Sequence, residues 1–426
     1  MFLIPVIALA VLWFRMDKKE PQVIITPQTE FVSLQTAFTV QVEDPGTGIR
    51  QVQALARQGE REVVIFTKDF DSPPGSWEGN FTLEGTGLPD GPLEIEITTA
   101  DASRNNWNKG NLSGEVLPVI LDTKPPVVSL AYATRYMRQG GAGCVAYTVS
   151  ESADQTGVQV GENFFPGYEY ESGKFVAFYA FPHSLEVSGN TPLLLTEDKA
   201  GNTVRTGFPV SVSSGKFTSD KINLSDRFLQ LKMPQFQDGV ETDLFATFLR
   251  VNGQVRMEDN ARILEVGRDT VNRPLWEDAF LRLPNAAPRA GFGDHRTYFY
   301  QGREVDQAYH LGVDLASLAR APVPAANNGR VVFADNLGIY GQTVIVDHGF
   351  GLQTLYSHLS EFNASVGDTV QKGQTIGRTG ETGMAFGDHL HFGVLVSGTP
   401  VNPIEWWDGQ WIVDKIEGCV SGLARE

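Results

Sequence analysis

The sequence predicts a mainly β protein of several domains. Its 426 residues exceed what one hydrophobic core ordinarily serves, so we expect more than one domain. Short runs that alternate apolar and polar residues, separated by Gly, Pro and Asp turns, fill residues 21–213 and return after residue 288. Residues 214–288 instead carry apolar residues at the three- and four-residue spacing of helices. The expected order is two tandem β-sandwiches, a helical connector and a C-terminal antiparallel β domain.

Residues 1–20 form a separate segment. Residues 2–14 are all apolar, and a charged stretch that begins at Arg15 follows at once. The apolar run is shorter than the roughly 20 residues that span a bilayer, and no basic residues precede it as they do in a signal peptide. A start codon assigned too late would explain the missing basic residues, and a buried strand is the alternative. We expect residues 1–20 to act as a membrane anchor or export signal.

Residues 21–122 and 123–213 resemble two tandem immunoglobulin-like domains of the bacterial type. In each, a strand ends in an aspartate, Asp101 or Asp198, and a polar turn follows. The sequence DTKPPVVSL at residues 122–130 marks the joint, because its paired prolines enforce extended backbone before a new strand. Such domains usually act as spacers or binding modules, and neither one clusters residues that suggest chemistry.

Residues 214–288 are predicted to form a helical connector. The sequences DLFATFLRV and NARILEVGRD have helical spacing, and Ser225 could cap the helix that begins at DRFLQL. A helical insert directly before the next domain could also occlude a cleft there. The polar residues of VNGQVRMEDNARIL are candidates to approach such a cleft, so connector and occluding segment both stay open.

Composition excludes several classes of protein. The net charge of −17 argues against nucleic acid or an anionic membrane as the main ligand, because both are polyanions. Two cysteines, Cys144 and Cys419, are too few for a disulfide scaffold or a Cys-rich zinc module. Their spacing does not decide whether they pair, and no feature indicates an oligomeric state.

Six of the seven histidines lie in the C-terminal β domain. His310 and Asp314 are four residues apart, so either a strand or a helix places them on one face. His389 and His391 share one face of a predicted strand, with apolar residues on the other. His358 follows the strand-like residues LQTLYS. Each piece alone has a plain structural interpretation, but together, in this order within one domain, they rarely occur by chance.

This order of motifs resembles the lysostaphin/LytM-type zinc metallopeptidases, the M23 family of peptidoglycan endopeptidases. The resemblance covers roughly residues 289–405 and includes the sequences YHLGVDLAS, YSHL, VGDTVQKGQTIGRTGETG and GDHLHFGV. It implies a zinc peptidase domain at residues 289–426, with three zinc ligands: His310, Asp314 and His391. Spacing alone does not separate His389 from His391, and the family motif makes this choice.

The resemblance also implies a mechanism. Two neutral imidazoles and one carboxylate leave a fourth zinc position for water, and a site charge of about +1 lowers the pKa of that water toward about 7. The zinc-bound water is then the nucleophile. His358 and His389 would take its proton and stabilise the oxyanion, in an order that the sequence does not assign.

The remaining candidates receive structural interpretations. His348 lies at a strand end beside a glycine turn, and His295 lies upstream of the predicted ligands. The glycine-rich loop GRTGETGMAFGD is expected to form one wall of a groove, because its glycines permit tight turns. Its residues Thr379 and Thr382 could contact substrate, but a structural role in the turns explains them equally well. No substrate-binding residue is assigned.

The resemblance implies peptidoglycan peptide cross-links as the substrate and Zn²⁺ as the cofactor. It places the protein in the cell envelope, in the periplasm or otherwise outside the cytoplasm, with anchoring to the inner membrane through its N-terminus. Glycyl bonds and D-Ala–diaminopimelate bonds are the two candidate targets, and we favour the second.

Two other functions stay open. The domain could be a non-catalytic wall-binding or amidase-activating protein of the same fold, although all five key positions are filled. A lipoyl-carrier-like barrel would fit VGDTVQKGQTIG, but no carrier lysine in a tight turn is present and the histidines would be unexplained.

Overall fold

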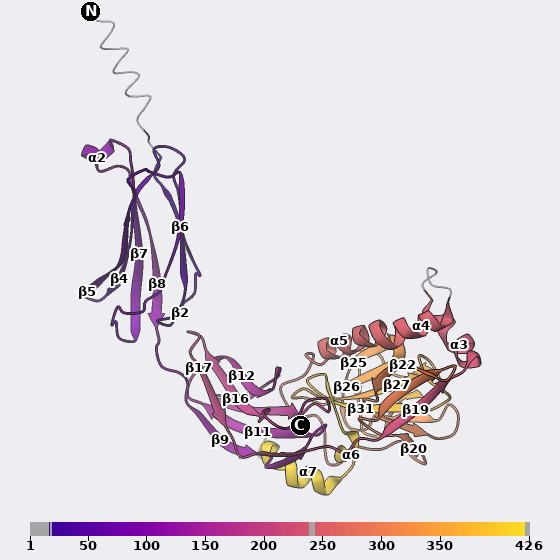
Figure 1. The fold of residues 1–426 in the computed structure, drawn as a ribbon. Coiled ribbons are helices and arrows are strands. Elements are labelled where there is room, and N and C mark those ends of the chain that lie inside the picture. The colour runs from indigo at the N-terminus through magenta and orange to yellow at the C-terminus, as the bar shows by residue number, and fades with distance from the viewer. Residues whose placement is uncertain (1–16, 18, 238–242, 422–426) are drawn as a thin grey trace, which may run out of the picture. The chain divides into compact units, whose positions relative to one another are not determined.

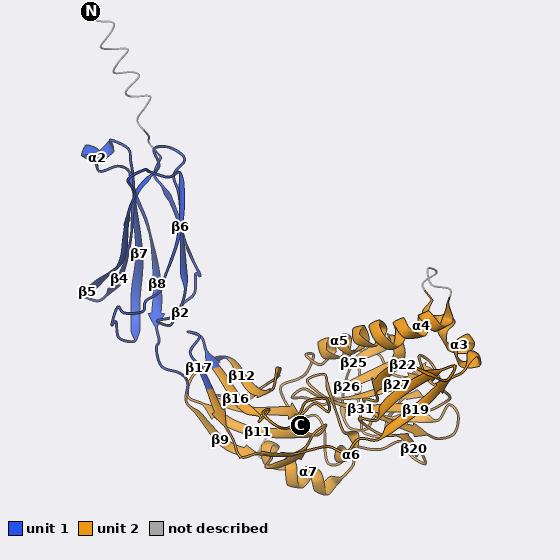
Figure 2. Cartoon of the chain, in the orientation of Figure 1, with its two compact units in different colours: residues 1–126, 152–154, 197–204 blue, residues 127–151, 155–196, 205–426 orange. Residues whose placement is uncertain are grey.

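The computed structural model describes residue 17, residues 19–237 and residues 243–421. The chain is mainly β, as predicted, and it divides into two compact units (Figures 1 and 2). The predicted anchor or signal segment, residues 1–20, lies outside the described residues except for its last few positions. Among the described helices, none combines the length and the apolar character needed to cross a bilayer.

The first unit is a β-sandwich of two sheets. Alternation in the sequence builds it: in β3, Phe38, Val40 and Val42 are fully buried while Thr39 and Gln41 are not. Side chains from both sheets share one hydrophobic core, as in sheet-on-sheet packing. The immunoglobulin-like assignment stays a prediction. One sheet has the order β1(Gln22–Thr26), β3(Phe38–Glu43), β6(Ser76–Phe81), and the other has the order β2(Phe31–Val32), β8(Leu112–Leu121), β7(Gly91–Asp101), β4(Ile49–Gln58), β5(Arg61–Asp69).

Residues 128–207 form two further four-stranded sheets. A buried hydroxyl contact links them, since the Tyr147 hydroxyl of the first sheet lies 3.0 Å from the Thr156 hydroxyl of the second, and Thr156 in turn lies 2.8 Å from the Thr196 hydroxyl within the second sheet. The first sheet has the order β14(Tyr168–Glu171), β15(Lys174–Ala180), β11(Ala142–Val149), β9(Val128–Ala133), and the second has the order β13(Asn163–Pro166), β12(Ala153–Val160), β16(Leu193–Asp198), β17(Thr203–Gly207).

An eight-stranded sheet forms the centre of the C-terminal β domain. Every residue of its strands β27 and β31 is buried, as expected for strands that are covered on both faces. The sheet has the order β20(Ala287–Ala290), β23(Val313–Ala316), β31(Leu390–Val396), β27(Leu352–Leu359), β26(Gly341–Asp347), β25(Gly329–Leu337), β29(Thr369–Val370), and β32(Thr399–Val401) pairs with β31. A smaller sheet, with the order β19(Ser219–Leu224), β21(His295–Tyr300), β22(Arg303–Tyr309), flanks it.

Residues 214–288 do more than connect two domains. They form the helices α3(Asp226–Lys232), α4(Leu244–Arg250) and α5(Arg256–Val266), and a π-helical turn joins the last two. Ser225 caps α3 as predicted, because its hydroxyl accepts a hydrogen bond of 3.1 Å from the Phe228 N–H. The segment also supplies β19, which pairs in parallel with β21.

The helices of this segment pack on the large sheet (Figure 1). Phe248 of α4 and Ile263 of α5 share a core with Ile345 of β26, Leu355 of β27 and Leu395 of β31. All five side chains are at most 2% exposed. The helices therefore belong to the hydrophobic core of the C-terminal β domain.

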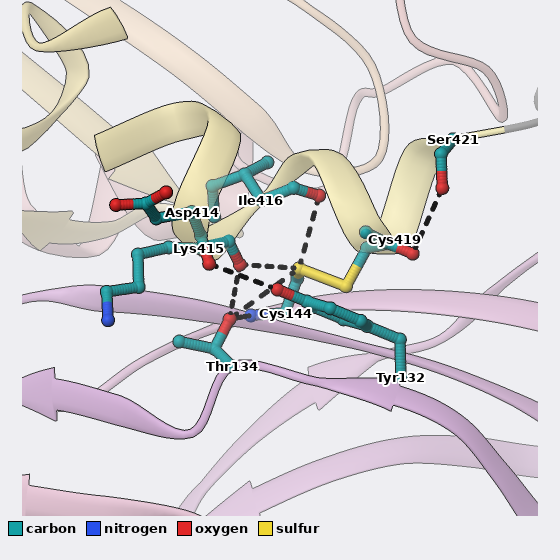
Figure 3. The surroundings of a disulfide bond; sticks show 9 residues. Tyr132, Thr134, Cys144, Asp414, Lys415, Ile416, Cys419 and Ser421 are labelled. Atoms are coloured by element: carbon teal, nitrogen blue, oxygen red, sulfur yellow. Dashed lines mark hydrogen bonds between the residues drawn. A yellow bond between two sulfur atoms is a disulfide. The ribbon is translucent and has the colours of Figure 1, made fainter. Parts of the chain in front are cut away.

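A disulfide joins Cys144 of β11 to Cys419 of α8(Glu417–Val420), across 275 residues of sequence (Figure 3). Hydrogen bonds reinforce the contact, since the Thr134 hydroxyl donates to the Lys415 carbonyl at 2.7 Å. The question that sequence spacing left open is thereby decided in favour of pairing. The C-terminal helices are tied to the sheet that contains β11.

We expect loss of this disulfide to destabilise the second unit. A crosslink that closes a long loop restricts the unfolded chain, so the double variant Cys144→Ala, Cys419→Ala should unfold with a free energy lower by about 3 kcal/mol. Urea titration of the wild type, oxidised and reduced, measures the effect, and the reduced wild type is the matched control for the variant. Equal midpoints for the oxidised wild type and the variant would contradict the expectation.

Candidate active site

The predicted ligand residues meet at one end of the large sheet. Antiparallel pairing places Asp314 on β23 directly opposite His391 on β31, and opposed residues share one face of a sheet. His310 lies between β22 and β23, four residues before Asp314. Leu390 and Phe392 point to the other face and are 1% and 2% exposed. The alternation in HLHF therefore directs the imidazole of His391 to one face and the apolar side chains to the other.

Three ligand atoms converge at this point. The Nε2 atom of His310 lies 2.9 Å from Oδ1 of Asp314 and 2.9 Å from Nδ1 of His391. The remaining distance, between Nδ1 of His391 and Oδ1 of Asp314, is 3.0 Å. Two nitrogens and one oxygen thus surround a common point, as the donors of a tetrahedral metal site do.

The protonation of these groups suits a zinc ion. Nδ1 of His310 lies 2.7 Å from the Gly291 carbonyl oxygen, so this nitrogen donates its proton there and Nε2 presents a lone pair. Burial lowers the pKa of His391 to about 4, which keeps its imidazole neutral. Burial raises the pKa of Asp314, but the surrounding histidines outweigh burial and hold that pKa well below its usual range. Two imidazoles and one carboxylate are a donor set that zinc accepts.

Arg296 orients the carboxylate from outside the ligand set. Its Nη2 donates a hydrogen bond of 3.0 Å to Oδ2 of Asp314, and this leaves Oδ1 directed at the two histidines. Arg296 lies on β21, in the smaller sheet that β19 extends. The sequence did not single it out, because nothing in its local pattern connects it to a residue on another sheet.

The predicted catalytic pair, His358 and His389, lies beside the ligands. The ring centroids of the two histidines are 4.8 Å apart, and Nε2 of His389 is 3.5 Å from Oδ1 of Asp314. The Nδ1 atoms of His358 and His389 lie 2.8 Å and 2.7 Å from the carbonyl oxygens of Thr382 and Gly387. Each ring therefore has its Nδ1 engaged by the backbone, and Nε2 of His389 lies beside the Asp314 carboxylate.

The two rings sit in different electrostatic environments. Burial, followed by the charges of His389 and His391, lowers the pKa of His358 well below its usual value. Burial also lowers the pKa of His389, but the hydrogen bond and charge of Asp314 outweigh it, and the net direction is upward. Neighbouring groups whose pKa values are pushed apart can divide acid and base roles between them.

His358 reaches the cleft through an unusual backbone conformation. It is the penultimate residue of β27 and has a φ of 60°, a left-handed conformation that is unfavourable by about 1–2 kcal/mol for a non-glycine residue. Such conformations concentrate at functional sites, where the surrounding structure enforces them. Its neighbour Ser357 pairs with His391 across the sheet.

The cluster opens into a cleft of about 400 Å³. The segment before residue 289 contributes part of its wall, with Asp220 and Ile222 from β19 and Arg256 from α5. Arg256 belongs to the polar stretch that was expected to approach the site. Arg289 and Arg296 also line the cleft, so three guanidinium groups surround the histidines.

The other histidines and threonines have structural partners. His348 is fully buried, with ring nitrogens 2.7 Å from the Asn328 carbonyl oxygen and 2.8 Å from the Thr354 hydroxyl. His295 contacts Gln307 on the neighbouring strand at 3.0 Å. Thr379 and Thr382 hydrogen-bond within the turns of the groove wall, the former to Asp388 and the latter to the Leu359 carbonyl.

A protein-family model described as "Peptidase family M23" matches residues 308–403, the segment that contains all five clustered residues. Residues 308–403 are an M23 peptidase domain. The expected resemblance is thereby confirmed for this part of the chain. The matched residues account for the ligand cluster and for the large sheet except β20, whereas Arg256, Arg289 and Arg296 lie outside them.

The M23 domain is similar to several known proteins. The DD-carboxypeptidase/endopeptidase Mpg of Neisseria meningitidis is 41% identical over 95 residues, which are 22% of this chain and 22% of that protein. The peptidoglycan DD-endopeptidase ShyA of Vibrio cholerae is 39% identical over 98 residues, 23% of each protein. The solved catalytic domain of lysostaphin from Staphylococcus simulans is 30% identical, with 31% of this chain and 98% of that chain covered and a TM-score of 0.27. The similarity thus covers less than a quarter of the length of Mpg and of ShyA.

Proposed function

We propose that this protein is a zinc-dependent endopeptidase that hydrolyses peptide cross-links of bacterial peptidoglycan. One observation carries the proposal: within the M23 domain, ligand atoms of His310, Asp314 and His391 lie no more than 3.0 Å from one another. Metal-assisted hydrolysis needs nitrogen and oxygen donors that converge on a metal ion and nearby groups that transfer protons, and two further histidines lie beside these donors. A purely wall-binding surface has no need of this arrangement.

The residues of the cleft have separate tasks in this proposal. His310, Asp314 and His391 would hold zinc, which supplies Lewis acidity and activates a water molecule for attack on the peptide carbonyl. His358 and His389 move protons at their Nε2 atoms, because the backbone already engages their Nδ1 atoms. Arg296 keeps the Asp314 carboxylate oriented toward the two ligand histidines.

ShyA is named a peptidoglycan DD-endopeptidase, which supports peptidoglycan as the substrate. A peptidoglycan substrate in turn implies a location outside the cytoplasm, in the cell envelope. The disulfide between Cys144 and Cys419 agrees with that location, since disulfides persist in oxidising compartments. Attachment to the inner membrane through residues 1–20 stays part of the proposal.

Digestion of purified peptidoglycan tests the activity. We expect the zinc-loaded protein to convert cross-linked muropeptide dimers to monomers, and mass analysis of the fragments identifies the cleaved bond. A chelator should stop the reaction and added zinc should restore it. If fragments appeared only when a separate wall amidase was added, the protein would be an activator rather than an endopeptidase.

The three arginines of the cleft indicate an anionic peptide as the substrate. Arg256, Arg289 and Arg296 lie around one cleft in a chain whose net charge is −17. Guanidinium groups bind carboxylates through paired, charge-assisted hydrogen bonds. Cell-wall stem peptides carry free carboxylates, so these residues suit the proposed substrate.

Replacing Arg256 by glutamine should weaken substrate binding. We expect KM to rise by about tenfold with kcat little changed, because one charge-assisted contact to the ground state is lost. Steady-state kinetics on a soluble cross-linked muropeptide measures the change. Arg262→Gln is the matched control, since Arg262 lies on the same helix and pairs with exposed Glu265. Equal KM values for both variants would remove Arg256 from substrate recognition.

A further inference from the structure

A second cluster of carboxylates lies in the first unit. Asp17 precedes β1, Asp44 follows β3, and Asp101 ends β7. One carboxylate oxygen from each of the three lies within 4.8 Å of the others. Like charges at this separation repel one another, and burial strengthens the repulsion.

Two of the three carboxylates are buried, Asp17 is half-buried, and backbone N–H groups hold the cluster in place. Asp44 and Asp101 are 1% and 0% exposed. Oδ1 of Asp44 accepts a hydrogen bond of 2.9 Å from the Gly46 N–H, and Oδ2 of Asp17 accepts one of 2.8 Å from the Thr47 N–H. The three carboxylates therefore occupy defined positions instead of turning out to solvent.

Three buried oxygens at this place have no hydrogen-bond partner: Oδ2 of Asp44, Oγ1 of Thr47 and Oγ of Ser103. Thr47 and Ser103 border the cluster, since their N–H groups donate to Asp17 and Asp101. A buried, unsatisfied oxygen costs about 1–3 kcal/mol, and a charged one costs more. Several such oxygens beside three carboxylates point to a ligand that supplies positive charge.

No side chain in the described part of the chain supplies that charge. None of the ion pairs that the structure describes includes Asp17, Asp44 or Asp101. The three carboxylates therefore have no cationic partner among the described side chains.

We propose that Asp17, Asp44 and Asp101 bind a calcium ion in the first β-sandwich. All candidate donors are oxygens, with no imidazole or thiolate among them, which favours a hard cation over zinc. Three carboxylates together with neutral oxygens suit the six to eight ligands of Ca²⁺ better than the strict octahedron of Mg²⁺. The ion connects the start of the described chain, at Asp17, to the ends of β3 and β7.

Calcium titration of the full-length protein, cleared of metals by a chelator, tests the site. We expect one Ca²⁺ per chain with a dissociation constant on the order of 10⁻⁴–10⁻³ M, as in extracellular modules. Calcium at tenfold excess over that constant should raise the melting temperature of the first unit. Sodium chloride of matched ionic strength should not, because screening alone does not fill the site.

Asp44→Asn separates the calcium site from a structural role. Without calcium this variant should be at least as stable as the wild type, because one repelling charge is gone, yet calcium should no longer stabilise it. Asp69→Asn, an exposed aspartate on β5 of the same sandwich, is the matched control and should respond as the wild type does. Asp17→Asn provides the same measurement if Asp44→Asn does not fold.

Two results would overturn the proposal. A calcium response of Asp44→Asn or Asp17→Asn equal to that of the wild type would remove these carboxylates from any site. Equal stabilisation by Mg²⁺ and Ca²⁺ would rule out a calcium-selective site. Neither result depends on peptidase activity, so the test is independent of the proposed function.

Discussion

Replacing His310 by alanine is expected to abolish both zinc binding and peptidoglycan hydrolysis. His310 supplies one of three convergent donor atoms, and its Nε2 lies 2.9 Å from both other donors. Two remaining ligands do not retain a catalytic zinc ion at ordinary concentrations, and without zinc the water is not activated. We expect hydrolysis to fall by at least about 10⁴-fold. Zinc content by atomic emission should fall from one ion per chain to a small fraction.

His295→Ala is the control for this variant. His295 lies on β21 and contacts Gln307, outside the ligand cluster. We expect it to keep full zinc content and hydrolysis within about twofold, since His295 is not fully buried and substitutions away from a site and outside the core have small effects. Full zinc content in His310→Ala, with activity retained, would refute the assignment of His310 as a ligand.

Replacing His358 or His389 by alanine should separate zinc binding from catalysis. Neither residue belongs to the converging ligand atoms, yet both line the cleft beside them. We expect each variant to retain one zinc ion and to lose hydrolysis by roughly 10²–10⁴-fold, the usual contribution of a general acid or base. The measurements are zinc content and the initial rate of muropeptide cleavage on the same preparation.

The activity of the double variant, in which both His358 and His389 are replaced by alanine, provides a second test of this prediction. Because the two histidines would act on one proton-transfer sequence, the double variant should lose little more activity than the more damaged single variant. Fully multiplicative losses would show that the residues act independently. Loss of zinc from either single variant would place that residue among the ligands instead.

Much of the fold followed from local patterns. Alternation predicted the sandwich strands because a strand sends successive side chains to opposite faces, as β3 does with Phe38, Val40 and Val42. Ser225 was identified as a helix cap because capping depends on residues three positions apart. The interpretation of residues 214–288 as a connector was incomplete, since β19 pairs with a strand that begins more than 70 residues later. Helical spacing shows which face of a helix is apolar, but it does not show which sheet that face covers.

The candidate site divides in the same way. His310, Asp314 and His391 stood out because their types and order are unusual, even though Asp314 and His391 are 77 residues apart. Arg296 did not stand out, because an arginine has no local signature for the carboxylate that it approaches, and Arg256 stood out only as one of several polar residues in VNGQVRMEDNARIL. The cluster of Asp17, Asp44 and Asp101 was invisible for the same reason, although the strand that ends in Asp101 was noticed.

The amino-acid sequence by itself determined the mainly β class, the M23 motifs and the chemistry of two imidazoles and one carboxylate. Only the tertiary structure decided that Cys144 and Cys419 pair, that α5 brings Arg256 to the cleft, and that three aspartates meet in the first sandwich. The physical reason is the separation along the sequence over which each kind of interaction acts. Periodicity, capping and turn preference act over a few residues, whereas these contacts join residues up to 275 positions apart and exist only once strands and helices have packed.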